Sequence, residues 1–143
     1  MNNTLIKFGY PDTIIKSYDH WSVLLRPQQV TLGSLILGAH SNAESFGELS
    51  TQTMAELSTV IKNIEQTLSN CFDYDKLNYL MLMMVDPHVH FHVLPRYSNY
   101  REFRTLKAED SAWPGPPDLT RTLEIDEIRM QELLEYLRDK WTA

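Results

Sequence analysis

The stretch His-Val-His-Phe-His-Val-Leu-Pro-Arg occupies residues 88–96, and its pattern decides the fold. Histidine and apolar residues alternate through it, and alternate side chains of a β-strand point to opposite faces of the sheet. The alternation therefore predicts a strand over 88–94 that Pro95 ends. Three histidine side chains are expected to lie in a row on one face of that strand: His88, His90 and His92.

Three histidines within five residues indicate a chemical site. Imidazole is the side chain whose ordinary pKa lies nearest to neutral pH, so a row of imidazoles can supply an uncharged nucleophile, a proton donor and a hydrogen-bond donor to phosphate. A single histidine on a strand is more often a structural or exposed polar residue. Three of them beside an apolar core face favour the functional interpretation.

A metal site is the competing interpretation of the same residues. A His-x-His pair on a strand is a common source of zinc or iron ligands, and His92, Asp86 or His40 could supply a third ligand. The sequence holds no second cluster of Cys and His, and the basic loop after the triad would repel a cation. We therefore predict no metal and no other cofactor, and a metal-binding protein is kept as an open alternative.

The residues before the triad predict further strands and one long helix. Apolar runs at 21–26 and 34–40 predict two strands joined by a loop over 27–33. After Ser50, which is suited to N-capping, apolar residues recur every three or four positions and predict an amphipathic helix. Those residues are Met54, Leu57, Ile61, Ile64 and Leu68. The run 77–85 is apolar at successive positions, which predicts a strand covered on both faces.

The residues after the triad combine a basic loop with a second helix. The basic residues of this loop are Arg96, Arg101, Arg104 and Lys107. Apolar residues at helical spacing from Ile128 to Trp141 predict an amphipathic C-terminal helix. The expected fold is α+β: an antiparallel sheet of about five strands with the long helix packed on one face, and a C-terminal helix.

Length and charge limit the class of protein. A chain of 143 residues suits a single domain over 1–143, with the triad core at about 15–97 and the basic loop and C-terminal helix at 98–143. The 13 Lys and Arg residues against 19 Asp and Glu residues give a net charge of −6, the wrong sign for a nucleic-acid binder. No leader pattern and no apolar run of ~18 residues is present, so a cytoplasmic protein without a membrane partner is expected.

The stretch 88–96 resembles the signature of the histidine triad (HIT) superfamily, His-apolar-His-apolar-His-apolar-apolar. All three histidines and all four apolar positions match. The order of elements over roughly 15–97 is also similar: strand, loop with Gly33, strand, long helix, apolar strand and triad strand. The resemblance therefore implies a HIT-like fold. Asp86-Pro87 and Trp113-Pro114-Gly115-Pro116 look more like a bacterial subgroup of HIT hydrolases than the dinucleoside polyphosphate enzymes.

The resemblance implies a nucleotide hydrolase or nucleotidyl transferase. The middle histidine, His90, would attack the α-phosphorus of a nucleotide anhydride, ester or phosphoramidate, and water would hydrolyse the nucleotidyl-histidine. A hydrogen bond from the other ring nitrogen of His90 to a backbone carbonyl of the same strand would hold its tautomer. His92 would bond non-bridging phosphate oxygens, and His88 would orient the site. Because HIT proteins are commonly homodimers, we expect a homodimer that acts on a nucleotide-type small molecule.

Several positions on the substrate side depart from the family's pattern. Arg26 stands where members place a ribose-binding Asn or Asp, and Ser34 stands where a fourth histidine is frequent. Residues 83–85, Met-Met-Val, replace polar residues that assist the leaving group in many members. Arginine can instead bind phosphate or carboxylate through two donors. Four residues are expected to bind substrate: Arg26, Ser34, Ile36 and Arg96. The departures keep a non-catalytic nucleotide-binding module as a second open alternative.

Overall fold

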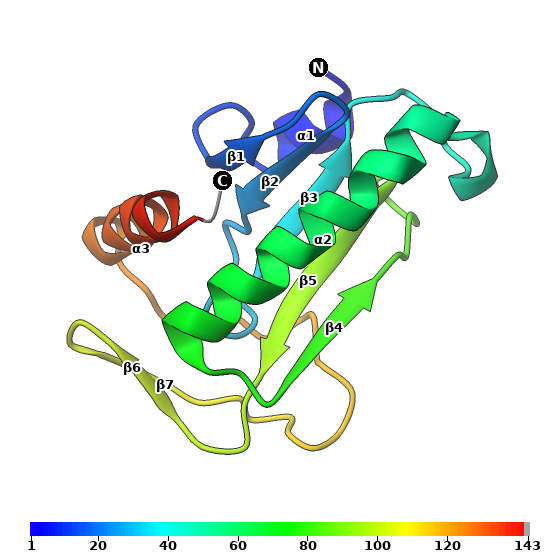
Figure 1. Ribbon diagram of the computed structural model, residues 1–143. Coiled ribbons are helices and arrows are strands. Elements are labelled where there is room, and N and C mark those ends of the chain that lie inside the picture. The colour runs from blue at the N-terminus through cyan, green and yellow to red at the C-terminus, as the bar shows by residue number, and fades with distance from the viewer. Residues whose placement is uncertain (142–143) are drawn as a thin grey trace.

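The computed structural model describes residues 1–141, and a five-stranded antiparallel sheet forms its centre (Figure 1). The order across the sheet is β1-β2-β3-β5-β4. The strands are β1 (Ile14–Ser17), β2 (Trp21–Leu25), β3 (Leu35–Ala39), β4 (Lys76–Leu80) and β5 (His90–Arg96). This confirms the predicted α+β fold. Residues 142–143 of the predicted domain lie outside the described range.

Helix α2 (Thr51–Phe72) covers one face of the sheet after a short 3-10 turn, η1 (Phe46–Glu48). Ser50 caps it as predicted, because its hydroxyl accepts the backbone N–H of Thr53 at 3.1 Å. The buried stripe of the helix packs in the main core with the strands, and its apolar members are Leu57, Val60, Ile64, Leu68 and Phe72. Met54 lies outside this stripe and is 40% exposed, so its predicted place in the core is wrong.

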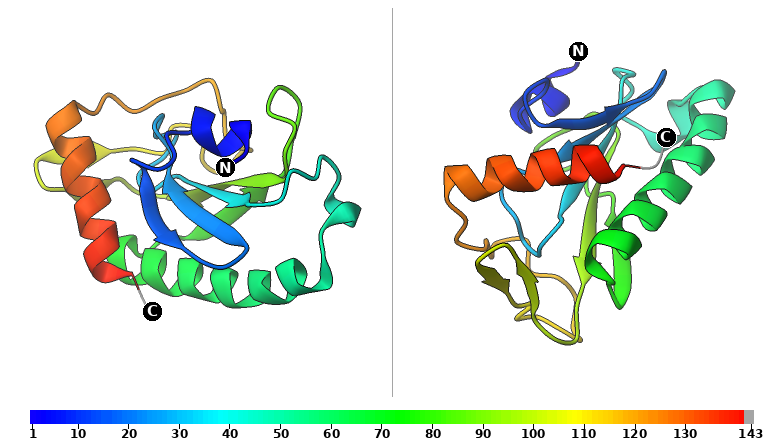
Figure 2. Two further views of the ribbon diagram at one scale, coloured as in Figure 1. Left: turned by 90° about the horizontal axis from the view of Figure 1, so that it is seen from above. Right: turned by 60° about the vertical axis from the view of Figure 1, so that its left-hand side comes forward.

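A short helix that the sequence pattern did not predict lies on the opposite face. Helix α1 spans Asn3–Lys7, and the view from above places the sheet between α1 and α2 (Figure 2). Asn2 caps α1 by accepting the N–H of Leu5 at 3.0 Å. A Cβ on Gly38 of β3 would lie 2.3 Å from Cδ2 of Leu5. The absence of a side chain at Gly38 therefore lets α1 approach the sheet closely.

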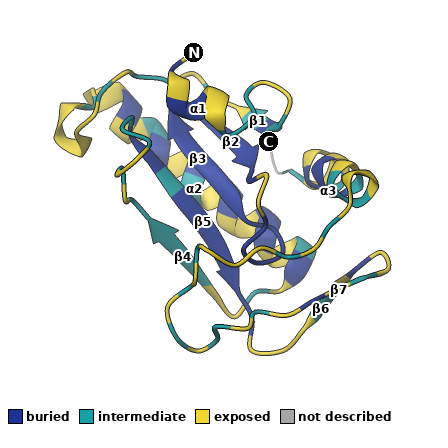
Figure 3. Ribbon diagram, turned by 180° about the vertical axis from the view of Figure 1, so that it is seen from behind, coloured by how far each residue is buried: buried dark blue, intermediate teal, exposed yellow. Residues whose placement is uncertain are grey.

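The C-terminal part adds a hairpin and a helix at one side of the sheet. Strands β6 (Arg101–Phe103) and β7 (Leu106–Ala108) pair with each other, and α3 spans Glu127–Lys140. This confirms the predicted C-terminal helix. Burial is greatest along β2, β3 and β5 and lower on the edge strand β4 (Figure 3). Of the helices in residues 1–141, none has the length and apolar character needed to cross a bilayer.

Two predicted strands have wrong boundaries. The apolar run 77–85 is a strand only as far as Leu80, because the chain turns at Met83, where φ is 51°. Beyond the turn, Met84 and Val85 are 85% and 83% exposed. The triad strand begins at His90, two residues later than predicted, and it continues past the predicted end.

Pro95 lies inside β5, where its missing N–H is not needed. The carbonyl of Arg96 accepts the N–H of Asp75 on the β4 side. Backbone groups of neighbouring strand residues point to opposite sides, so those of Pro95 point toward β3. Pairing with β3 has already ended at Val93, opposite Leu35. The proline therefore interrupts no ladder on that side, and the expectation that it ends the strand fails.

Candidate active site

His90 and His92 lie side by side on the face of β5 that α1 covers. Their ring centroids are 5.2 Å apart, and the residues are 1% and 7% exposed. Their partners across the sheet in β3 are Gly38 and Ile36, respectively. The strand alternation therefore holds for two of the three predicted histidines.

The ring of His90 is held in one tautomer. Its Nδ1 lies 2.7 Å from the carbonyl oxygen of His88. Because a carbonyl oxygen can only accept, Nδ1 carries the proton of the neutral ring. Nε2 then holds a lone pair, and no residue among 1–141 forms a hydrogen bond with it. His90 has the geometry of an uncharged nucleophile.

His92 is held in the opposite tautomer. Arg26 donates its Nε–H to Nδ1 of His92 at 3.3 Å, so the proton of the neutral ring lies on Nε2. Burial, followed by the charge of Arg26, lowers the pKa of His92 to about 4. The ring is therefore neutral near pH 7. The two adjacent rings offer a lone pair on one and an N–H donor on the other.

The side chain of His88 does not join this row. His88 precedes β5, and its Nδ1 lies 2.9 Å from the hydroxyl of Thr4 in α1. The same hydroxyl accepts the backbone N–H of His88 at 3.3 Å. The predicted row of three is wrong because the strand alternation begins only at His90. His88 contacts the histidine pair through its carbonyl oxygen.

The two histidines line a cavity of about 250 Å³, here called the histidine pocket. Lys7 at the end of helix α1 and the C-cap residue Phe8 form one wall, and the loop 82–86 forms another. The ring of Phe8 lies 5.7 Å from that of His90 and 5.8 Å from that of His92, between centroids. Nζ of Lys7 pairs with Asp86 of the loop at 2.8 Å. An ion pair thus joins the two walls.

Of the predicted substrate residues, Arg26 lies in the histidine pocket, whereas Ile36 and Ser34 do not line it. Ile36 is fully buried beside His92 and packs with Leu5 under α1. The hydroxyl of Ser34 donates to the carbonyl of Thr31 at 2.7 Å and accepts the N–H of the same residue at 3.0 Å. Both of these predicted ligand residues instead have structural roles.

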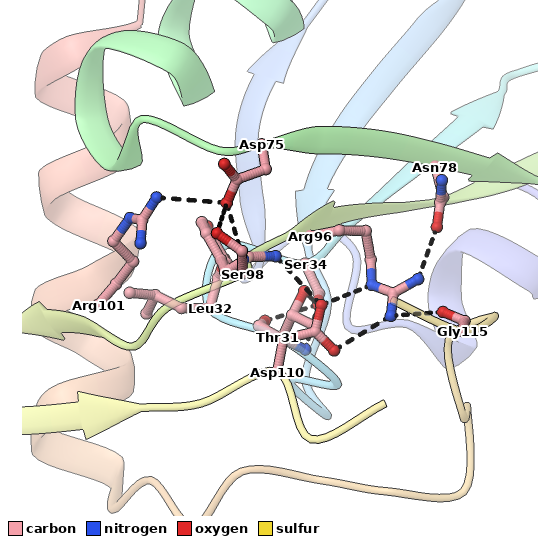
Figure 4. A network of polar contacts seen from close by, with 11 residues as sticks. Thr31, Leu32, Ser34, Asp75, Asn78, Arg96, Ser98, Arg101, Asp110 and Gly115 are labelled. Atoms are coloured by element: carbon pink, nitrogen blue, oxygen red, sulfur yellow. Dashed lines mark hydrogen bonds and ion pairs between the residues drawn. The ribbon is translucent and has the colours of Figure 1, made fainter. Parts of the chain in front are cut away.

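Arg96 is held in an internal ion pair, which corrects its predicted role in substrate binding (Figure 4). Its Nε donates to Asp110 at 2.7 Å, and both side chains are nearly fully buried. The terminal nitrogens donate to Asp110, to Asn78 at 2.9 Å and to the carbonyl of Gly115 at 2.9 Å. These contacts tie the segment after β7 to the sheet. The donors of this guanidinium are therefore occupied by acceptors within the protein.

The other arginines of the predicted basic loop also bind partners outside the histidine pocket. Arg101 donates to the carbonyls of Phe72 and Asp73, at the end of α2. Arg104 forms an exposed ion pair with Glu132 of α3 at 3.6 Å. Both arginines belong to the hairpin β6–β7 and neither lines the histidine pocket, which the loop pattern in the sequence did not indicate.

The residues proposed as metal ligands have other partners. Asp86 pairs with Lys7, and Nε2 of His40 lies 2.8 Å from the hydroxyl of Ser22. Within residues 1–141, no three or more His, Cys, Asp and Glu side chains are grouped as a metal site.

Sequence reasoning missed the contribution of α1 to the site. Thr4, Lys7 and Phe8 all contact the histidines or line their pocket. A helix of five residues is too short to show a periodic apolar stripe. The available local signal is Asn2, a residue type favoured at helix N-caps. Leu119, which reaches the pocket from the segment before α3, had no signal in the sequence.

Comparison with known proteins agrees with this fold. A family model, the HIT domain, matches residues 10–99. The match spans more than half of the chain, and the protein belongs to the HIT domain family. Comparison with curated protein sequences found no significant match.

Solved structures of HIT proteins share the fold at low sequence identity. A histidine triad protein from Bradyrhizobium japonicum is 23% identical, with a TM-score of 0.75 over 99% of this chain and 97% of that one. A histidine triad protein from Sinorhizobium meliloti is 18% identical, with a TM-score of 0.75 over 98% and 95%. The diadenosine triphosphate hydrolase of Plasmodium falciparum is 9% identical, with a TM-score of 0.60 over 91% and 74%.

Proposed function

We propose that this protein is a nucleotide hydrolase or nucleotidyl transferase in which His90 forms a covalent nucleotidyl-histidine. The observation that carries the proposal is the pair of opposite tautomers. His90 directs a lone pair, and His92 an N–H, from two adjacent rings that line one pocket. A neutral ring nitrogen is a good nucleophile at pH 7 and leaves readily once it is phosphorylated. The diadenosine triphosphate hydrolase activity of a structural neighbour belongs to the same reaction class.

The proposed reaction has two displacements at the α-phosphorus. Nε2 of His90 forms a bond to phosphorus while the bond to the leaving group breaks, and the leaving group takes the electron pair. The His88 carbonyl stabilises the positive charge that develops on the ring through Nδ1–H. The N–H of His92 donates to a non-bridging oxygen, where charge must be balanced. Water then attacks phosphorus, the bond to Nε2 breaks, and nucleoside monophosphate is released.

The proposal is tested by release of nucleoside monophosphate from dinucleoside polyphosphates and nucleoside phosphoramidates in the presence of a chelator. Wild type is expected to release product, His90→Ala is expected to lose this activity, and His20→Ala serves as a control because His20 lies outside the pocket. Rapid acid quenching followed by mass spectrometry is expected to show one nucleotidyl group on wild type and none on His90→Ala. Turnover by His90→Ala at the wild-type rate excludes the histidine nucleophile.

The same panel separates the proposal from a non-catalytic module. Such a module would be stabilised against heat by a panel compound without releasing product. Stoichiometric zinc or iron in the purified protein, together with loss of activity in the chelator, would instead favour the metal-binding alternative.

We further propose a second copy of this chain as a partner. Strand β4 is an edge of the sheet, and the loop after it exposes Leu82, Met84 and Val85. An open strand edge beside exposed apolar side chains favours association between chains. Light scattering on a size-exclusion column is expected to give twice the chain mass. The double variant Met84→Glu with Val85→Glu is expected to lower the measured mass to that of one chain.

A further inference from the structure

Arg26 is a buried guanidinium without a counter-charge. It is 6% exposed, and its two hydrogen bonds go to neutral acceptors: Nδ1 of His92 and the carbonyl of Gln28, at 2.7 Å from NH1. The ion pairs found within residues 1–141 do not include it. A buried charge without an opposite charge is unfavourable in the free protein. Arg96 illustrates the ordinary solution, since its guanidinium is paired with Asp110.

Arg26 lies where two cavities meet, because it lines both of them. Beside the histidine pocket is a smaller one of about 160 Å³, here called the side pocket. Its lining comprises Lys7, Phe8, Arg26, Pro27 and Gln28. Four of these five residues also line the histidine pocket, so the two cavities adjoin.

The charges of the side pocket have one sign. Lys7 and Arg26 line it, and the rest of its lining is uncharged. The nearby acid, Asp86, lines only the histidine pocket and neutralises Lys7 in part, through a contact at 2.8 Å on a lysine side chain that is 53% exposed. The positive charge of Arg26 remains uncompensated. The complementary ligand group is therefore an anion.

We propose that the side pocket binds a second anionic group of the substrate, next to the phosphate that His90 attacks. This inference rests on the proposed function and narrows its substrate class. The guanidinium can offer two parallel N–H donors to a phosphate or carboxylate, whereas the lysine adds a mobile point charge. The second anion can be a phosphate on the sugar of a nucleotide or a further phosphate in an anhydride chain. Either group would present negatively charged phosphate oxygens to Arg26.

Binding of four adenosine compounds distinguishes these sources. The compounds are AMP, ADP, adenosine 2′,5′-bisphosphate and adenosine 3′,5′-bisphosphate, measured by titration calorimetry on the wild type. At least one of the three doubly phosphorylated compounds is expected to bind tenfold or more tightly than AMP. Tighter binding of ADP indicates an anhydride chain, and tighter binding of a sugar bisphosphate indicates a phosphate on the ribose.

Variants then test whether Arg26 carries the preference. Arg26→Gln is expected to reduce the affinity ratio of the preferred compound over AMP to near one, and Lys7→Gln is expected to reduce it less. Arg104→Gln removes an exposed arginine of the β6–β7 hairpin and is expected to leave the ratio unchanged. If Arg26→Gln does not fold, the affinities of Arg26→Lys are measured instead. Lysine keeps the positive charge but loses the paired N–H donors. The affinity ratio of the preferred compound over AMP is therefore expected to lie between one and the wild-type value.

Two results would overturn the inference. One is equal affinity of the wild type for all four compounds, including no measurable binding of any. The other is an equal loss of affinity for AMP and the bisphosphates in Arg26→Gln, which would mean that Arg26 serves only the reacting phosphate. These readouts need no turnover. A retained preference together with inactive wild-type protein would therefore reject the proposed reaction while supporting the anion site.

Discussion

The hydroxyl of Thr4 lies 2.9 Å from Nδ1 of His88, a residue 84 positions further along the chain. Because this hydroxyl also accepts the backbone N–H of His88, two contacts fix the residue whose carbonyl orients the ring of His90. The N-terminal helix is thus connected to the proposed nucleophile through one intermediate residue. Thr4 is a positioning residue in this arrangement, since it acts on His90 only through His88.

Replacing Thr4 by valine tests this connection. Valine keeps the shape of threonine but removes both contacts to His88, so the carbonyl is less well fixed and kcat is expected to fall about tenfold with little change in KM. Thr4→Ser keeps the hydroxyl and is expected to restore most of the activity. Steady-state kinetics on the best compound of the nucleotide panel supply the measurement. A loss of kcat in Thr4→Ser with wild-type kcat in Thr4→Val would point to a packing role for the methyl group instead.

The sequence predicted the histidine pair on one strand face well and its surroundings poorly, for physical reasons. Strand alternation is local, so the shared face of His90 and His92 follows from spacing alone. The role of Arg96 does not, because its partner Asp110 is brought to it by the path of the chain after β7. Arg26 and Arg96 look alike in sequence, and only their three-dimensional partners separate an arginine in the pocket from one buried in an ion pair.

The depressed pKa of His92 predicts a pH dependence of stability. The unfolded chain has an ordinary histidine pKa near 6.5, whereas the folded value is about 4, so protons favour the unfolded state between these values. The free energy of unfolding is therefore expected to fall as pH drops from about 6.5 to about 4. His92 is expected to contribute nothing to this slope above that window.

Urea unfolding of wild type and His92→Gln across pH 4.5 to 7.5 measures the effect. The difference between the two proteins isolates His92 from the other groups that titrate. Wild type is expected to lose stability relative to the variant as the pH falls, with a slope that corresponds to about one proton. A pH-independent difference would show that His92 titrates alike in the folded and unfolded states.

The buried pair of Arg96 and Asp110 is expected to matter for stability. Removing one partner leaves an uncompensated buried charge, so Arg96→Met or Asp110→Asn is expected to cost about 3 kcal/mol or more of unfolding free energy. The combined variant Arg96→Met with Asp110→Asn removes both charges and is expected to cost less than the sum of the single changes. Urea unfolding at constant pH measures all of these proteins.

Binding separates this structural role from the one expected from sequence. At a temperature where Arg96→Met remains folded, its affinity for the preferred nucleotide is expected to lie within about threefold of wild type. A selective loss of nucleotide affinity in fully folded protein would restore Arg96 as a ligand residue.

Gly38 is expected to control how closely α1 sits over the histidines. A side chain at this position would overlap Leu5, whose Cδ2 lies 2.3 Å from the added Cβ. Gly38→Val is therefore expected to displace α1, to lower stability by about 1–3 kcal/mol and to reduce activity together with it. Gly47→Val provides the control, because a Cβ there would have no neighbour within 4 Å. Unchanged activity in a destabilised Gly38→Val protein would mean that α1 is dispensable for catalysis.

Phe8 is expected to help keep His92 neutral. Its ring lies edge-on to that of His92, with 5.8 Å between centroids, and burial is the largest cause of the low pKa of His92. Phe8→Ala admits water to this side of the ring, so the pKa is expected to rise from about 4 toward the ordinary 6.5. NMR titration of the imidazole resonances in wild type and variant measures the shift directly.

Phe46→Ala is the control. It alters a partly exposed ring that packs on Phe91 outside the histidine pocket, and it is expected to leave the pKa of His92 unchanged. If Phe8→Ala also leaves it in place, then the charge of Arg26, which donates to Nδ1 of the same ring, is the dominant cause, and Arg26→Gln is the variant in which the rise must be seen.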